Sequence, residues 1–430
     1  MTFGLLGGAL LSAHLTAGGV VTQKQVTAEE TAPSYRLQEI LTPVWEGEIA
    51  YQESVLPVRD ANNELAPISL LYPALEIIEV KSASLSTTYE EGVDYTLSDN
   101  GELIVLTSGK IPTLSYAEFH PTSNSMNIQA ADGGYLCFHE GDYFHSRQIV
   151  VTYRHKADYK GYVPKGKAER FPNVLKKLSD KEDIDLLVFG DSISVGGNAS
   201  GFLNVAPYMP TYPELFAKGL EAEYGVTVHI RNFSVGGQTS TWGATEIDNV
   251  LTQVNDVDLA IVAFGMNDTS LDNQTYLANV TRISNTIRES YASAEVILVA
   301  PMWPNPNAVG FLGNQITFYE ALEGYEQENV GVAVANVTKV HESLLQYKRY
   351  EDMTGNNVNH TNDYLTRVYA QTLLKTMQEE PVKEPETPVD DLVEEPAIDK
   401  GGCGSVIGGV ALGAFAGAGA AMLIRKNKED

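Results

Sequence analysis

The chain has 430 residues, a length that suggests two or three domains. Because 43% of the residues are hydrophobic and 20% are charged, most of the chain is expected to fold around hydrophobic cores. Its 56 acidic and 29 basic side chains give a net charge of −27, which argues against nucleic acid or anionic lipid as a partner of the folded part. The only two cysteines, Cys137 and Cys403, exclude a disulfide-stapled scaffold and a cysteine-rich zinc site.

The first 30 residues are rich in apolar and small side chains, and Phe3–Val21 is similar to the apolar core of a signal peptide. No lysine or arginine precedes this stretch, so either the export signal is atypical or the true start lies upstream. We interpret residues 1–30 as a signal-peptide-like segment and expect the protein to be exported.

Residues 35–155 have the pattern of β-strands. Tyr95–Ser98 and Glu102–Leu106 flank the turn sequence Asp99-Asn100-Gly101, which predicts a hairpin. No helical period is sustained here, so we predict an all-β sandwich domain over residues 35–155. Residues 156–183 are basic with a short helical pattern, and we interpret them as a connector.

From residue 184 to residue 378, strand and helix patterns alternate. Five short apolar runs predict strands at Leu186–Phe189, Val226–Ile230, Leu259–Phe264, Val296–Ala300 and Val332–Val334. Helical patterns lie between or after them, at Tyr212–Tyr224, Tyr276–Tyr291 and Asn362–Met377. This alternation predicts an α/β domain whose parallel sheet is covered on both faces, with its ligand site at the carboxyl ends of the strands.

The C-terminal part has two segments that are unlike a globular domain. Residues 379–400 are acidic and proline-rich, which is typical of an extended linker. Within residues 401–430, Ser405–Ile424 carries no charge and precedes Arg425 and Lys426. We therefore expect a C-terminal transmembrane helix with a cytoplasmic C-terminus, which would anchor the protein at the cell surface. The alternative is a buried helix rich in glycine and alanine.

Four short motifs fall at strand ends or before the last helix of the α/β domain. They are Gly190–Ile193, Asn232–Thr239, Gly265–Asp268 and Asn359–Asp363. Each is weak alone, but together and in this order they resemble the four blocks of the SGNH (GDSL) hydrolase family. The resemblance covers residues 184–377. It implies a three-layer α/β/α fold around a flavodoxin-like parallel sheet of five strands.

The resemblance also implies roles for four residues. Ser192 would be the nucleophile, His360 the base, and the N–H groups of Ser192, Gly237 and Asn267 would bind the oxyanion. The alternatives are purely structural roles: a helix N-cap for Ser192, a turn glycine for Gly237 and a turn-capping amide for Asn267. Gly236 is the rival of Gly237 for the oxyanion role. No metal and no organic cofactor is implied.

The sequence departs from the family pattern three residues before the histidine. Many members carry an aspartate there to orient the imidazole, whereas this chain has Asn357. An asparagine can accept a hydrogen bond but brings no charge, so either Asn357 or a backbone carbonyl would orient His360 in a Ser–His dyad. We interpret Asp191 and Asp268 as carboxylates that brace the loops.

A few further residues invite a functional interpretation. Trp242 closely follows the second motif and Trp303 follows the predicted strand Val296–Ala300, so both are candidates for substrate binding, with ordinary aromatic packing as the alternative. His139, Glu140 and His145 suggest a metal site at first sight, but the spacing is not that of a zinc motif. We interpret these three as surface residues of strands.

The predicted function is that of a surface-tethered serine esterase with an O-acyl ester substrate. A β-sandwich ahead of an SGNH domain resembles carbohydrate O-deacetylases, so an acetylated glycan is the expected substrate, with short-chain esters or lipids as the alternative. A rival of another class is a non-catalytic surface protein that binds glycans or mediates adhesion. The complete Ser–Gly–Asn–His set argues against this rival.

Overall fold

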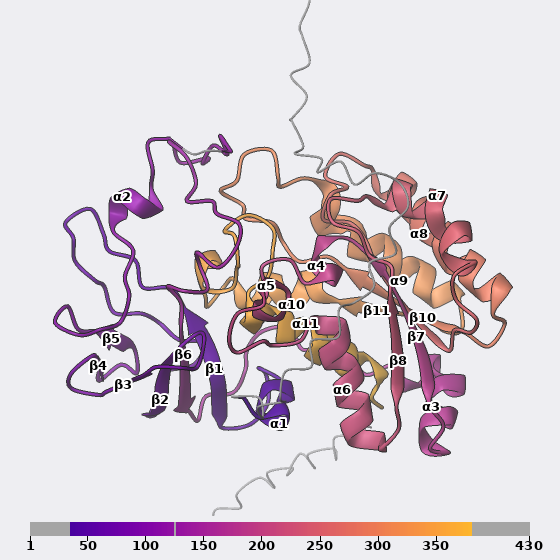
Figure 1. The fold of residues 1–430 in the computed structure, drawn as a ribbon, viewed down its shortest axis with the longest axis horizontal. Coiled ribbons are helices and arrows are strands. Elements are labelled where there is room, and N and C mark those ends of the chain that lie inside the picture. The colour runs from indigo at the N-terminus through magenta and orange to yellow at the C-terminus, as the bar shows by residue number, and fades with distance from the viewer. Residues whose placement is uncertain (1–34, 124–125, 381–430) are drawn as a thin grey trace, which may run out of the picture. The chain divides into compact units, whose positions relative to one another are not determined.

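The computed structural model describes residues 35–123 and 126–380 (Figure 1). The strands are β1 (Ile49–Val55), β2 (Glu76–Ser82), β3 (Thr88–Tyr89), β4 (Tyr95–Leu97), β5 (Leu103–Val105), β6 (Ile149–Arg154), β7 (Ile184–Gly190), β8 (Val228–Asn232), β9 (Leu259–Ala263), β10 (Glu295–Ala300) and β11 (Val332–Asn336). The α-helices are α1 (Leu37–Leu41), α2 (Tyr116–Phe119), α3 (Pro172–Ser179), α4 (Ser192–Val195), α5 (Ser200–Leu203), α6 (Tyr212–Tyr224), α7 (Ser240–Leu251), α8 (Asn273–Ser290), α9 (Phe318–Glu328), α10 (Val337–Leu344) and α11 (Asp363–Met377). Three short 3₁₀ helices span Ala168–Arg170, Asn314–Thr317 and Tyr350–Asp352.

A parallel sheet of five strands forms the centre of the α/β domain. Its strand order is β11-β10-β9-β7-β8, and all four neighbouring pairs are parallel. The chain starts at β7, moves outward to β8, and then crosses to β9 on the other side of β7. The strand order therefore reverses between β7 and β9. Ligands of such sheets bind outside the carboxyl ends of the strands at this point. The predicted flavodoxin-like sheet of five strands is confirmed.

Helices cover both faces of this sheet (Figure 1). Side chains along a strand alternate between faces, so in β7 Leu187 and Phe189 pack with α7, α8 and α9, whereas Leu186 and Val188 pack with α3, α6 and α11. Strands β7, β9, β10 and β11 are largely apolar because both of their faces are buried, whereas the edge strand β8 has the sequence VHIRN and is partly exposed. The predicted three-layer α/β/α arrangement is therefore confirmed.

The β-rich region, residues 35–155, contains two antiparallel sheets. The larger has the strand order β1-β6-β2-β3, and the smaller is the hairpin β4–β5. The hairpin forms where the sequence predicts it, and Gly101 in its turn has φ +77°. The connection from β5 to β6, the last strand of this region, spans residues 106–148 and includes α2.

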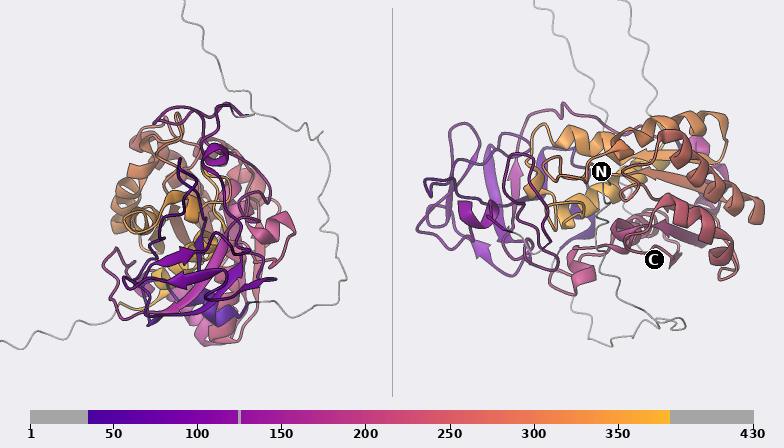
Figure 2. Two further views of the ribbon diagram at one scale, coloured as in Figure 1. Left: turned by 90° about the vertical axis from the view of Figure 1, so that its left-hand side faces the viewer. Right: turned by 90° about the horizontal axis from the view of Figure 1, so that it is seen from above.

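The β-rich region and the α/β domain share one hydrophobic core. Val55 of β1, Val151 of β6, Val188 of β7 and Leu365 of α11 belong to the same cluster of buried side chains. Helix α11 contacts β11 on one side and β1 on the other, and so lies between the two sheets (Figures 1 and 2). The β-rich region is thus packed on the α/β domain through an apolar interface.

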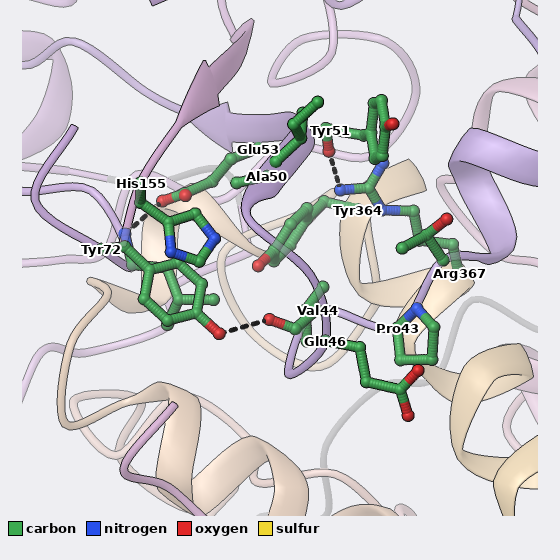
Figure 3. Close-up of a pocket in the computed structure, with 13 residues that line it drawn as sticks. Pro43, Val44, Glu46, Ala50, Tyr51, Glu53, Tyr72, His155, Tyr364 and Arg367 are labelled. Atoms are coloured by element: carbon green, nitrogen blue, oxygen red, sulfur yellow. Dashed lines mark hydrogen bonds between the residues drawn. The ribbon is translucent and has the colours of Figure 1, made fainter. Parts of the chain in front are cut away.

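Buried polar contacts fix this interface. Lys348 Nζ lies 2.6 Å from Glu53 Oε1, and the two side chains are 0% and 1% exposed. Tyr153 Oη donates to the other oxygen of Glu53 at 2.6 Å. Figure 3 shows the adjoining pocket, where Tyr72 Oη donates to the Val44 carbonyl at 2.8 Å and Arg367 of α11 donates to the backbone of β1.

The predicted C-terminal transmembrane helix has to be corrected. None of the helices that the structure describes between residues 35 and 380 is long and apolar enough to cross a membrane. The stretch that prompted the prediction, 405–424, lies outside the described residues, as do the signal-peptide-like segment 1–30 and most of the linker 379–400. A transmembrane helix is therefore no part of the fold described here.

Candidate active site

Ser192 lies where β7 ends and α4 begins. Asp191 is the N-cap of α4, and its carboxylate accepts a hydrogen bond from Ile193 N at 3.0 Å. The helix ends after one turn at Gly196, whose φ of +93° suits a residue without a side chain. This tight strand–helix turn leaves the Ser192 hydroxyl facing the loop that carries the histidine.

The side chains of Ser192, His360 and Asn198 form a hydrogen-bonded chain. His360 Nε2 lies 2.9 Å from Ser192 Oγ, and His360 Nδ1 lies 2.5 Å from Asn198 Oδ1. Asn198 Nδ2 donates to the Gly141 carbonyl at 3.1 Å, which leaves its oxygen to accept. Nδ1 therefore carries the proton, and the lone pair of Nε2 is free to accept the serine proton.

The loop of residues 354–360 holds His360 by its backbone. Asn356 Oδ1 accepts from the N–H groups of Val358, Asn359 and His360 at 3.0–3.1 Å. The carbonyl of His360 accepts from Gly355 N at 3.0 Å and from the Thr354 hydroxyl at 2.8 Å. These contacts close the loop on itself and place the imidazole before α11 begins.

The predicted oxyanion donors lie at the ends of β8 and β9, the two neighbours of β7. A Cβ added to Gly236 would lie 3.7 Å from Ser192 Cβ, so the Gly236–Gly237 turn is beside the serine. Gly237 has φ +76°, which explains a glycine there. Asn267 Nδ2 donates one hydrogen bond to the Gln238 carbonyl at 2.9 Å, and its second N–H has no further acceptor among the residues that the structure describes.

The two aspartates next to the motifs brace loops, as interpreted. Asp268 accepts from the backbone N–H and the hydroxyl of Ser240 at 3.0 and 2.9 Å, which ties the β9 end to the start of α7. Burial raises the pKa of Asp268, and it raises the pKa of Asp191 to about 7 although the Ile193 N–H and His360 act against it. The ring nitrogens of His360 pair with Asn198 and Ser192 and not with either aspartate.

The proposed orienting role of Asn357 has to be corrected. Its side-chain nitrogen donates to the Cys137 carbonyl at 3.2 Å, and its oxygen accepts from Asn305 Nδ2 at 3.0 Å. Asn357 has φ +65° and is 2% exposed, so it is a buried support of the loop whose side chain is committed elsewhere. Asn198 holds the imidazole instead.

The two tryptophans differ in their surroundings. The Trp242 ring lies 5.5 Å from that of Phe189 and 6.3 Å from that of Phe264, which is the aromatic packing considered as the alternative to substrate binding. Trp303 follows β10, and its backbone N–H donates to His341 Nδ1 at 3.1 Å. The buried indole N–H of Trp303 has no partner among the described residues. A role of Trp303 in substrate binding stays a prediction.

Sequence reasoning missed two residues beside the imidazole. Asn198 lies in a Gly-Gly-Asn turn six positions after the nucleophile, and the lack of an aspartate before His360 was the signal to look for such an acceptor. Glu140 was interpreted as a surface residue of a strand. It lies in a loop of the β-rich region instead, with its Oε2 atom 3.6 Å from His360 Nδ1.

Part of the α/β domain is similar to a known protein family. Residues 188–364 match the model of the GDSL-like lipase/acylhydrolase family. No curated protein sequence matches the chain. Among solved structures, it is similar to a two-domain esterase active on acetylated mannans, with 18% identity and a TM-score of 0.40, over 52% of this chain and 58% of the other. It thus spans little more than half the length of that esterase.

Two shorter proteins are similar at the same level. One is a variant of Axe2, an acetyl xylan esterase from Geobacillus stearothermophilus (15% identity, TM-score 0.38, 47% of this chain and 97% of the other). The other is a lipolytic G-D-S-L family member from Veillonella parvula (17%, 0.36, 44% and 96%). The match of residues 188–364 includes the four motifs, so this part of the α/β domain is similar to the GDSL-like lipase/acylhydrolase family.

Proposed function

We propose that the protein hydrolyses O-acyl esters by a Ser–His mechanism. The observation that carries the proposal is the 2.9 Å contact of Ser192 Oγ with His360 Nε2, whose ring is held in the accepting tautomer by Asn198. Ser192 Oγ forms a bond to the ester carbonyl carbon while its proton passes to Nε2. The imidazolium then gives this proton to the leaving alkoxide as the ester C–O bond breaks.

The second half of the reaction restores the serine. His360 takes a proton from water while the water oxygen bonds to the acyl carbon, and the imidazolium then returns this proton to Ser192 Oγ as the bond between the acyl carbon and Oγ breaks and the carboxylic acid leaves. In both halves the carbonyl oxygen becomes negative. The backbone N–H groups of Ser192 and Gly237 and the free N–H of Asn267 are the donors proposed to bind it.

For the substrate, we propose an O-acetylated glycan. The support is the order of the two regions along the chain, a β-rich region followed by a GDSL domain, which resembles that of carbohydrate O-deacetylases. Aromatic side chains at the edge of the site, of which Trp303 is the candidate, would pack on sugar rings. We also propose that the protein is exported.

The test compares the wild-type chain with Ser192→Ala on three substrates: p-nitrophenyl acetate, its octanoate analogue and acetylated xylan. We expect acetate release by the wild type and a loss of several orders of magnitude in the variant, with an unchanged melting temperature. An inactive wild type would favour a glycan-binding protein. Activity on octanoate but not on the acetylated polymer would favour a lipase.

A further inference from the structure

A loop of the β-rich region reaches the catalytic imidazole. Glu140 Oε2 lies 3.6 Å from His360 Nδ1, while its other oxygen accepts from Asn356 Nδ2 at 3.1 Å. The next carbonyl along the chain, that of Gly141, accepts from Asn198 Nδ2 at 3.1 Å. The loop that carries Glu140 and Gly141 thus contacts three residues of the active site. They are His360, Asn198, which orients the His360 ring, and Asn356, which holds the backbone around His360.

The residue that accepts the hydrogen bond from His360 Nδ1 carries no negative charge. In the proposed mechanism the imidazole becomes positive twice per cycle, and a carboxylate beside Nδ1 stabilises that state. Asn198 supplies an acceptor in the correct place, but its amide oxygen is neutral. The position three residues before His360 holds Asn357, which faces away.

Two carboxylates interact with His360, and they differ in their availability. Asp191, from the turn between β7 and α4, is 2% exposed, and burial raises its pKa to about 7, so it is not fully ionised at neutral pH. Burial also acts to raise the pKa of Glu140, but the hydrogen bond and charge of His360 and the amides of Asn356 and Asn198 outweigh it and hold that pKa low. Glu140 therefore carries its charge at neutral pH.

We propose that Glu140 is a positioning residue that supplies the negative charge stabilising the protonated His360, while Asn198 supplies the orientation. The task of the usual aspartate is thus divided between a neutral acceptor in the α/β domain and a carboxylate from the β-rich region. The inference rests on the proposed Ser–His mechanism. Because 57% of the Glu140 side chain is exposed, water screens its charge, and the expected effect is moderate.

The test uses the full chain and the variants Glu140→Gln, Asn198→Asp and their combination, with kcat and KM for p-nitrophenyl acetate measured from pH 5 to pH 9. Glu140→Gln keeps the size and removes the charge, so kcat should fall about tenfold with an unchanged KM. Because the imidazolium is less stable, the acidic limb of the kcat/KM profile should move to lower pH, by up to about one unit. Asn198→Asp puts a carboxylate oxygen beside Nδ1, and although its second oxygen then faces the Gly141 carbonyl, the added charge should raise kcat in the Glu140→Gln background.

The matched control is Glu76→Gln. Glu76 belongs to β2, has a similarly exposed side chain at 63%, and pairs with Arg154 far from the motifs, so its variant should keep the wild-type kcat and pH profile. A Glu140→Gln variant with wild-type kcat would overturn the proposal. So would a fall in kcat without a shift of the acidic limb and without rescue, which would indicate a structural role. An active Ser192→Ala would instead overturn the Ser–His mechanism itself.

Discussion

The two sides of the active site are built in different ways. The nucleophile side, with Ser192, Gly237 and Asn267, lies on turns that leave the three adjacent strands β7, β8 and β9. The histidine side, residues 354–360, is irregular backbone that does not follow a strand of the parallel sheet. It is held by its own hydrogen bonds and by the loop of residues 137–141 of the β-rich region.

This difference shows what each region contributes. Parallel strands bring their carboxyl ends to one edge, so the nucleophile side is assembled by the sheet itself. The histidine side depends on contacts that join residues more than 200 positions apart, such as Asn356 with Glu140 and Asn357 with the Cys137 carbonyl. The β-rich region is therefore a structural part of the active site.

The largest expected effect comes from breaking the docking of the β-rich region. Lys348→Met leaves the buried Glu53 without its cation, which should lower the free energy of unfolding by about 3–5 kcal/mol. Chemical denaturation checks it. Lys160→Met removes an exposed pair with Asp158 and should leave the denaturation midpoint unchanged. Equal midpoints for the two variants would show that the buried pair does not hold the regions together.

The contact between the two sides offers the next test. A Cβ on Gly355 would lie 2.5 Å from Asn198 Cβ and 2.9 Å from the Thr361 carbonyl oxygen, so Gly355→Ala must shift the histidine side away from Asn198. A displacement of about 1 Å is enough to lower kcat about 100-fold. Steady-state kinetics measure it, with Gly324→Ala in α9, where the added Cβ meets nothing, as the control. A kcat within about threefold of the wild type would argue that the loop adapts.

A smaller effect should appear on acidification. Burial lowers the pKa of His341 to about 3, below the value of about 6.5 that it has when unfolded. The unfolded chain thus binds the proton more readily, so this contribution to stability is complete above pH 6.5 and decreases as pH falls towards 3. From pH 7 to pH 5 the loss is about 2 kcal/mol.

The variant that tests this effect is His341→Asn, which keeps an acceptor for the Trp303 N–H. Its free energy of unfolding should vary less with pH than that of the wild type over the same interval. Because the His341 ring lies 5.8 Å from that of Tyr350, whose hydroxyl donates to the Val358 carbonyl, acid should weaken the histidine side first. Parallel curves for wild type and variant would contradict the assignment.

The smallest effect on activity is expected at Asn357. Asn357→Asp would face the Cys137 carbonyl with a second oxygen, so stability should fall, while kcat should stay within about twofold. If Asn357 oriented the imidazole, the new carboxylate would raise kcat instead. Kinetics and a melting curve on the same sample separate the two outcomes.

The sequence predicted the α/β domain well because its signals are local. The strand predicted at Leu259–Phe264 is observed at Leu259–Ala263, and the helix predicted at Tyr212–Tyr224 is observed with those bounds. Apolar runs and capping residues fix such elements over a few positions. Three of the four motifs could be placed at strand ends for the same reason, and the fourth before the last helix.

The partner of His360 Nδ1 could not be predicted in this way. Asn198 is 162 positions away from the histidine, and Glu140 comes from a loop with no periodic pattern. Their approach depends on how two regions pack, which a single sequence does not show. The family pattern pointed to position 357, where the side chain satisfies a buried carbonyl instead.

The shared core has a consequence for how the chain unfolds. Val55 and Val151 lie in the same cluster of buried side chains as Val188 and Leu365. Separating the β-rich region from the α/β domain would therefore expose a continuous apolar surface to water. Neither region can melt while the other keeps its core. Calorimetry should therefore record a single endotherm for residues 35–380, with a van't Hoff enthalpy equal to the calorimetric one.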